Sequence, residues 1–176
     1  ITFSRKDYEL TKEADVSQLF KDFFDIGIVI HLAGDSGGIG YNHKYPGTIF
    51  YNETMSNTLM QEYSRINNVK KFVGVGTVCS YPKFTPVPFK EENLWNGYPE
   101  ETNAPYGLSK KMMLVQSQAY RQEYNFNGIH LLMINLYGPE DDFDLENGHV
   151  IATLIRKFTE AKKRNGDRIS RDQCNA

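Results

Sequence analysis

A tyrosine and a lysine four residues apart, Tyr106 and Lys110, form the first pair of side chains that could do chemistry together. The pattern of residues 105–124 predicts a helix, and side chains four residues apart lie on one helix face. A neighbouring ammonium lowers the pKa of a phenol from about 10, so the phenol can exchange a proton with a substrate oxygen. The spacing alone carries little weight, because Tyr8 and Lys12 repeat it.

Further reactive side chains follow two of the expected strands. Thr77 and Cys79 place a hydroxyl and a thiol after the strand predicted at 72–76, and His149 follows the turn after the strand predicted at 129–136. Each has an ordinary structural alternative: Thr77 as a helix or turn cap, Cys79 as a small core residue, and His149 as a surface residue near a helix start. All of them falling at strand ends of one sheet is much less expected by chance, which indicates an active site there.

Alternating elements must position these side chains. Apolar spacing predicts helices over 16–24, 46–67, 105–124 and 150–164. Apolar, β-branched runs predict strands over 26–32, 72–76 and 129–136, the first and last buried on both faces. Residues 80–104 predict a long ordered loop. This alternation is typical of a doubly wound parallel α/β sheet, in which ligands bind beyond the carboxyl ends of the strands.

Composition narrows the possible partners. The 176 residues carry 20 Lys+Arg against 22 Asp+Glu, a formal charge of −2, which gives no electrostatic reason to expect nucleic acid or an anionic membrane as partner. No apolar run approaches the roughly 18 residues of a membrane helix. Two cysteines, Cys79 and Cys174, exclude a disulfide framework and favour a reduced, cytoplasmic compartment. The chain starts at Ile1 without a secretory leader, and we expect it to be part of a longer protein.

Five stretches of the chain resemble the extended short-chain dehydrogenase/reductase (NAD-dependent epimerase/dehydratase) family. They are HLAGDSGGI (31–39), GTVCSYPK (76–83), NAPYGLSKKM (103–112), NLYGPEDDFD (135–144) and GHVIATLIRK (148–157). The resemblance implies a partial Rossmann-like NAD(P)-binding domain over 1–169 and an unassigned tail over 170–176. It also implies that the first βαβ unit and the C-terminal substrate domain are missing, which should leave a sheet edge or an apolar sheet face uncovered.

The resemblance implies a role for each candidate residue. Thr77, Tyr106 and Lys110 form a triad in which Tyr106 donates the proton when hydride reduces C4 of the sugar and Lys110 also holds the nicotinamide ribose. Cys79 and His149 exchange protons at C3 and C5, work that suits a thiol and an imidazole. Lys157 contacts the substrate diphosphate. The residues implied to line an NADP site are Val75, Gly76, Thr77, Val78, Tyr106, Lys110, Met133, Ile134, Asn135, Leu136 and His149.

The implied activity is NADPH-dependent 3,5-epimerisation and 4-reduction of GDP-4-keto-6-deoxymannose to GDP-L-fucose or a closely related deoxysugar. The same resemblance implies a homodimer formed through the helices 46–67 and 105–124. Two alternatives stay open: another nucleotide-sugar 4-epimerase or 4,6-dehydratase of the family, and a non-catalytic binding remnant. A dehydratase typically has an acidic pair after the catalytic Thr, whereas Val78 and Cys79 follow here.

A glycine motif in the chain imitates a dinucleotide fingerprint. Gly34, Gly37 and Gly40 follow a predicted strand at the right general spacing. A true fingerprint opens into a helix that packs on the sheet, but residues 41–45 carry no apolar stripe. We therefore interpret the motif as a later loop that flanks the cofactor, and we expect this chain by itself to be inactive.

Overall fold

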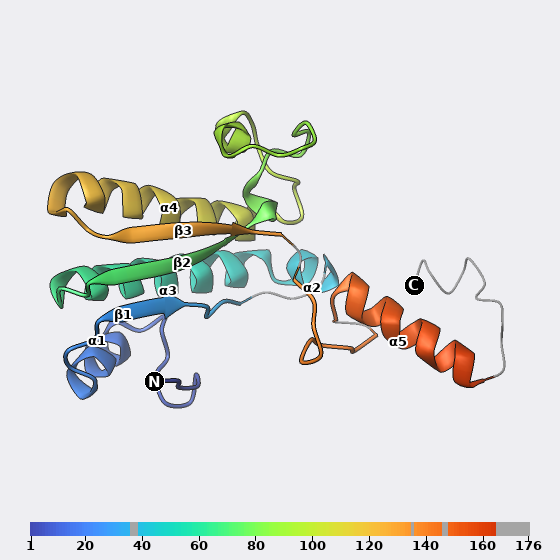
Figure 1. Ribbon diagram of the computed structural model, residues 1–176, viewed down its shortest axis with the longest axis horizontal. Helices are drawn as coiled ribbons and strands as arrows, with labels where there is room; N and C mark the ends of the chain where they lie inside the picture. The colour runs from blue at the N-terminus through green and yellow to red at the C-terminus, as the bar shows by residue number, and fades with distance from the viewer. Residues whose placement is uncertain (36–38, 135, 146–147, 165–176) are drawn as a thin grey trace.

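Three parallel strands, hydrogen-bonded in the order β1-β2-β3, form the centre of the fold (Figure 1). They are β1 (Ile28–His31), β2 (Lys71–Thr77) and β3 (Gly128–Met133). The computed structural model describes residues 1–35, 39–134, 136–145 and 148–164. Parallel neighbours need crossover connections, and a long helix supplies each of them. The prediction of a parallel α/β sheet is confirmed.

Most helices lie where the apolar spacing predicts them. The helices are α1 (Glu13–Asp22), α2 (Ile39–Lys44), α3 (Pro46–Ile66), α4 (Ala104–Tyr124) and α5 (Val150–Lys163). Proline is tolerated in the first turn of α3 and of α4, where a backbone N–H has no helical partner. The six-residue α2 and the 3-10 turns η1 (Val78–Ser80) and η2 (Glu91–Trp95) were not predicted, since segments this short leave no periodicity to detect.

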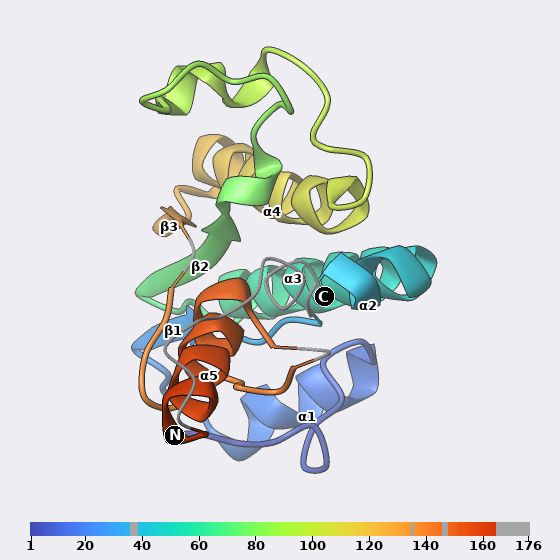
Figure 2. The ribbon, with the colours of Figure 1, turned by 90° about the vertical axis from the view of Figure 1, so that its right-hand side faces the viewer.

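The helices α1, α3 and α4 all pack on one face of the sheet, as the view along the strands shows (Figure 2). Their apolar residues meet the inward-facing strand residues in one core. That core contains Val16, Leu19 and Phe20 of α1, Leu59 and Met60 of α3, Met113 of α4, and Val29 and Phe72 of the strands. Burial on this face holds α4, with Tyr106 and Lys110, against β2.

The opposite face of the sheet is exposed in the part of the chain that the structure describes. Ile28 and Ile30 of β1 are 62% and 61% exposed, and Leu131 of β3 is 40% exposed. The prediction that the first and last strands are buried on both faces is therefore wrong. An apolar run in the sequence does not show whether a helix covers each face of the strand. The expected uncovered apolar sheet face is confirmed.

The expected domain boundary and the expected lack of a membrane helix can be compared with the structure only over the described residues. The boundary between a domain over 1–169 and a tail over 170–176 lies among residues that the structure does not describe. Among the described residues, no helix is long and apolar enough to cross a membrane.

Candidate active site at the strand ends

The carboxyl ends of β2 and β3 lie side by side. Thr77 pairs with Met133 and Gly76 with Leu132, so the two backbone segments predicted to line a cofactor site start at the same sheet edge. In the first segment, Gly76 and Thr77 are buried, and Val75 and Val78 are half-buried. In the second, Met133 is half-buried and Ile134 and Leu136 are exposed, whereas Asn135 lies outside the described residues.

Thr77 links β2 to the turn that carries Cys79. The Thr77 Oγ1 accepts a hydrogen bond from the backbone N–H of Cys79 at 3.2 Å and caps η1. Thr77 therefore acts as a cap, as the structural alternative predicts, but this hydrogen bond uses only a lone pair of its hydroxyl oxygen. The hydroxyl keeps its own proton to donate to a substrate oxygen. Cys79 is half-buried and its thiol is free.

The first turn of α4 lies directly against η1. Ser80 Oγ donates to the carbonyl oxygen of Gly107 at 2.8 Å. A Cβ atom at Gly107 would collide with the carbonyl oxygen of Cys79, so the close approach requires glycine. Because Tyr106 precedes Gly107, this contact holds the start of the tyrosine helix beside the Thr77–Cys79 segment.

Tyr106 and Lys110 lie on one face of α4, as predicted. The Lys110 Nζ is 5.7 Å from the centroid of the Tyr106 ring. Lys110 is buried, and its Nζ forms an ion pair with Glu53 Oε2 of α3 at 2.9 Å. Only 4% of the Lys110 side chain and 0% of the Glu53 side chain are exposed. The ammonium is thus held in place from the helix next to its own.

Glu53 belongs to a buried network of polar side chains that the sequence does not predict. Its other oxygen, Oε1, accepts from the backbone N–H of Asp35, in the loop after β1. Asn57 Nδ2 donates to Glu53 Oε2 at 3.4 Å, and His31 Nε2 donates to Asn57 Oδ1 at 2.9 Å. One pattern could have indicated it: Glu53, Asn57 and Gln61 recur at intervals of four, which places them on one helix face.

Two histidines face Lys110 from the sheet, and both are neutral near pH 7. Burial, with the Lys110 charge as a second cause, lowers the pKa of His31 from 6.5 to about 4. Burial and then the same charge lower the pKa of His130 to about 4. The positive charge at this site is therefore carried by Lys110 and not by the neighbouring imidazoles.

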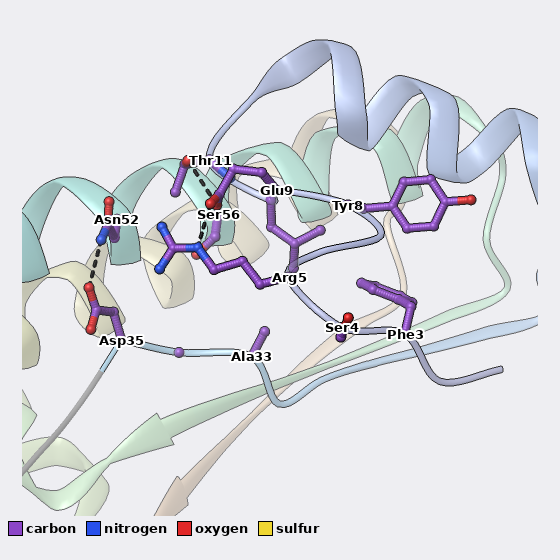
Figure 3. Close-up of a pocket in the computed structure, with 12 residues that line it drawn as sticks. Phe3, Ser4, Arg5, Tyr8, Glu9, Thr11, Ala33, Asp35, Asn52 and Ser56 are labelled. Atoms are coloured by element: carbon purple, nitrogen blue, oxygen red, sulfur yellow. Dashed lines mark hydrogen bonds and ion pairs between the residues drawn. The ribbon is translucent and has the colours of Figure 1, made fainter.

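A hollow of about 210 Å³ opens at the carboxyl end of β1 (Figure 3). It lies between the N-terminal segment 3–11, the loop 33–35 and two residues of α3, Asn52 and Ser56. In Figure 3, Asn52 points toward Asp35, and its Nδ2 donates to Asp35 Oδ2 at 2.6 Å. Ligands of parallel α/β sheets bind at this end of the strands. No role for segment 3–11 follows from its sequence.

His149 contacts an aspartate of the loop that follows β3. It precedes α5, is exposed, and places Nδ1 3.2 Å from Asp141 Oδ1. Figure 2 shows α5 on the β1 side of the molecule, whereas η1 and α4 lie toward β3. The recorded side-chain contact of His149 is therefore with Asp141, and its expected pairing with Cys79 stays a prediction. Lys157 lies half-buried on α5. The structure therefore gathers Thr77, Cys79, Tyr106 and Lys110 where β2 ends and α4 begins.

A family model and several known proteins are similar to this chain in sequence. A model described as the NAD dependent epimerase/dehydratase family matches residues 3–171. The probable GDP-L-fucose synthase 1 of Oryza sativa subsp. japonica is 35% identical over 162 residues, which cover 92% of this chain and 49% of that protein. The chain spans about half the length of the curated relatives it matches.

Solved structures of GDP-sugar enzymes are also similar to this chain. A GDP-L-fucose synthetase from Naegleria fowleri bound to NADP matches with a TM-score of 0.86 and 25% identity, covering 97% of this chain and 56% of that chain. A GDP-D-glycero-L-gluco-heptose synthase from Campylobacter jejuni, solved in the presence of NADPH, matches with a TM-score of 0.85 and 30% identity. The second match covers 92% of this chain and 47% of that chain.

Proposed function

The chain belongs to the NAD dependent epimerase/dehydratase family, and from this membership we propose that it carries the catalytic side chains of a GDP-sugar epimerase/reductase. The proposed reaction is NADPH-dependent 3,5-epimerisation and 4-reduction of GDP-4-keto-6-deoxymannose to GDP-L-fucose or a closely related deoxysugar. One observation carries the proposal: Tyr106 and Lys110 share a face of α4, and Gly107 docks that helix against the Thr77–Cys79 segment.

In the reduction, these residues manage the carbonyl oxygen at C4. Thr77 donates its hydroxyl proton in a hydrogen bond that polarises the carbonyl, and Tyr106 transfers its phenolic proton to the oxygen. NADPH, when bound, supplies the hydride that adds to C4. With the hydride on carbon and the Tyr106 proton on oxygen, the carbonyl becomes an alcohol. Lys110 supports the phenolate that Tyr106 becomes, because a nearby ammonium favours the anion.

In the epimerisation, Cys79 is the proposed acid or base at C3 and C5. Its thiol is free and half-buried at the end of β2, close in sequence and space to Thr77. A role for His149 as its partner and for Lys157 at the diphosphate rests on the family resemblance. The recorded contact of His149 is with Asp141 and gives no geometric support for that pairing.

The described residues fit the nicotinamide-ribose end of NADPH. A buried ammonium with three N–H donors spends one on Glu53 and can offer others to ribose hydroxyls. The backbone at 75–78 and 133–136 would line the nicotinamide. Both solved structures above bear names or descriptions that pair a GDP-sugar enzyme with NADP or NADPH, which supports NADPH as the cofactor.

The alternatives are less well supported. A 4,6-dehydratase typically has an acidic pair after the catalytic Thr, where this chain has Val78 and Cys79. A binding remnant would have no need to keep Thr77, Tyr106 and Lys110 gathered at one sheet edge. A 4-epimerase of the same family shares that triad, but its reaction gives no role to the thiol of Cys79.

We also propose a homodimer formed through α3 and α4. These helices pack on each other, and Met112 and Val115 of α4 stay 46% and 47% exposed outside the core. Sedimentation of the full-length protein as a monomer at micromolar concentration would contradict a dimer. A cytoplasmic location stays a prediction.

The reaction is tested with Tyr106→Phe in the full-length protein, supplied with GDP-4-keto-6-deoxymannose and NADPH. Loss of a positioned proton donor lowers the rate of NADPH oxidation about 10²- to 10⁴-fold. Tyr124→Phe is the matched control, because Tyr124 lies at the far end of the same helix. Equal rates for wild type and Tyr106→Phe would contradict the assignment.

A further inference from the structure

Glu53 connects three segments around the candidate site. From α3, it binds the Lys110 ammonium of α4 through Oε2 and the Asp35 backbone N–H of the loop after β1 through Oε1. Its side chain has no exposed surface. A buried carboxylate with both oxygens engaged is costly to desolvate unless its partners are well placed, so its geometry is tightly fixed. The same carboxylate therefore fixes the tyrosine helix relative to the loop that lines the hollow in Figure 3.

The first glycine of the fingerprint-like motif is explained by this carboxylate. A Cβ atom at Gly34 would lie 2.9 Å from Glu53 Oε1 and 3.7 Å from Lys110 Nζ. In contrast, a Cβ atom at Gly40 would meet nothing within 4 Å. The absence of a side chain at Gly34 thus makes room for the Glu53–Lys110 pair, a role that differs from contacting a phosphate.

Glu53 also supplies the negative charge next to Lys110. Titratable groups near Lys110 come from four elements: His31 from β1, His130 from β3, Tyr106 from α4 and Glu53 from α3. Both imidazoles are neutral near pH 7 because burial lowers the pKa of each to about 4. Among the described residues, Glu53 is the carboxylate in ion-pair contact with this ammonium.

We propose that Glu53 is a positioning residue for the reduction: its carboxylate holds the Lys110 ammonium, and with it the loop after β1, in the arrangement that the Tyr106 proton transfer requires. This inference rests on the function proposed above. Glu53 touches neither the substrate nor the reacting atoms and acts through Lys110. Gly34 serves the same arrangement by leaving space for the carboxylate.

The first test compares Glu53→Gln with Glu62→Gln in the full-length protein, using steady-state kinetics and a pH profile. Glu62 is a matched control because it lies on the same helix and pairs with Arg65, away from Lys110. Glu53→Gln keeps the shape but removes the charge, and we expect kcat to fall about 10- to 10²-fold, the scale on which misplacement affects rates. The KM for the nucleotide sugar should change little.

The pH profile separates positioning from a merely structural role. Removing a buried negative charge disfavours the protonated state of the site, so the alkaline limb of the Glu53→Gln profile should move to lower pH. Glu53→Asp should restore the wild-type limb, because it keeps the charge, while recovering only part of kcat. An unmoved alkaline limb in Glu53→Gln would overturn the proposal. A wild-type protein without activity would instead count against the proposed function.

A second test measures thermal stability and not activity, so it can be carried out even if Glu53→Gln folds poorly. Gly34→Ala should lower the melting temperature of the wild type more than Gly40→Ala does, because its Cβ meets the Glu53 carboxylate. In a Glu53→Asp background, where the carboxylate is one methylene further back, the Gly34→Ala penalty should shrink. Additive effects in this double-mutant cycle would show that Gly34 and Glu53 are not coupled and overturn the proposal.

Discussion

At the scale of single residues, Cys79 separates epimerisation from reduction. The Cys79 thiol is free at the end of β2. The Thr77 hydroxyl accepts a hydrogen bond from the backbone N–H of Cys79, which an alanine at position 79 also has, so Cys79→Ala leaves this cap intact. We expect Cys79→Ala to lower solvent-deuterium incorporation at C3 and C5 about 10²- to 10⁴-fold while NADPH binding is unchanged. Cys174→Ala is the chemically matched control. Deuterium exchange that survives Cys79→Ala unchanged would remove Cys79 from the mechanism.

The buried histidine His31 makes stability depend on pH. Its pKa is about 4 in the folded chain against 6.5 when unfolded, so the unfolded state binds the extra proton between these values. This contribution to stability is complete above pH 6.5 and is lost as pH falls toward 4. Between about pH 7 and pH 5 we expect His31 to account for roughly 2 kcal/mol of lost unfolding free energy.

Urea unfolding at both pH values measures the effect of His31. In His31→Gln the loss between the two pH values should be smaller by that amount, since glutamine does not titrate. His43→Gln is the control, because it makes the same substitution at an exposed position of α2. Identical pH dependence in wild type and His31→Gln would contradict the prediction.

The sequence predicts the reactive residues better than the residues that support them. Tyr106, Lys110, Thr77 and Cys79 carry recognisable types at recognisable places, and the structure gathers them. Glu53 escaped notice because a polar stripe on a helix normally faces water, and only the packing of α3 on α4 shows that this one is buried. The position of His149 depends on how the chain runs after β3, which local sequence does not determine.

At the scale of elements, the junction between α4 and η1 decides whether the site assembles. A Cβ atom at Gly107 would collide with the Cys79 carbonyl oxygen, which is backbone and cannot swing aside. We expect Gly107→Ala to lower the free energy of unfolding by about 1–3 kcal/mol, the usual effect of overpacking. The activity of the full-length protein should fall with it, because Tyr106 moves away from Thr77.

Gly47 supplies the control for that junction. It also lies in the first turn of a long helix, α3, but a Cβ atom there would meet nothing within 4 Å. Gly47→Ala should therefore leave stability unchanged or raise it by up to about 1 kcal/mol, because alanine favours the helix. A Gly107→Ala protein as stable as Gly47→Ala would show that the junction tolerates a side chain.

Element boundaries follow from the sequence to within a few residues, because apolar spacing and proline positions are local properties. The helix predicted at 46–67 is observed at Pro46–Ile66, and the strand predicted at 72–76 at Lys71–Thr77. The burial of the strand faces does not follow. β1 is apolar on both faces, yet described helices cover only one of them, and coverage is a property of the whole assembly.

At the scale of the whole molecule, the arrangement of strand ends predicts how well this chain binds its cofactor. Dinucleotide pyrophosphates are held chiefly by backbone amides where a glycine-rich turn opens a helix against the sheet. Among the described residues, β1 leads toward the six-residue α2 and β2 leads into η1. Neither is a long helix packed on the strands, so the described part supplies no such cradle.

We therefore expect these 176 residues alone to bind NADPH very weakly. Lys110 and the strand-end backbone can hold the ribose, but the missing charge-assisted contacts are worth about 1.5–3 kcal/mol each. Loss of two or three weakens binding roughly 10³-fold or more. Titration of NADPH fluorescence measures this, with the full-length protein as the positive control. Saturable micromolar binding by the chain alone would mean that Gly34, Gly37 and Gly40 form the phosphate-binding turn, and that the strand after which they lie is the first strand of the dinucleotide fold.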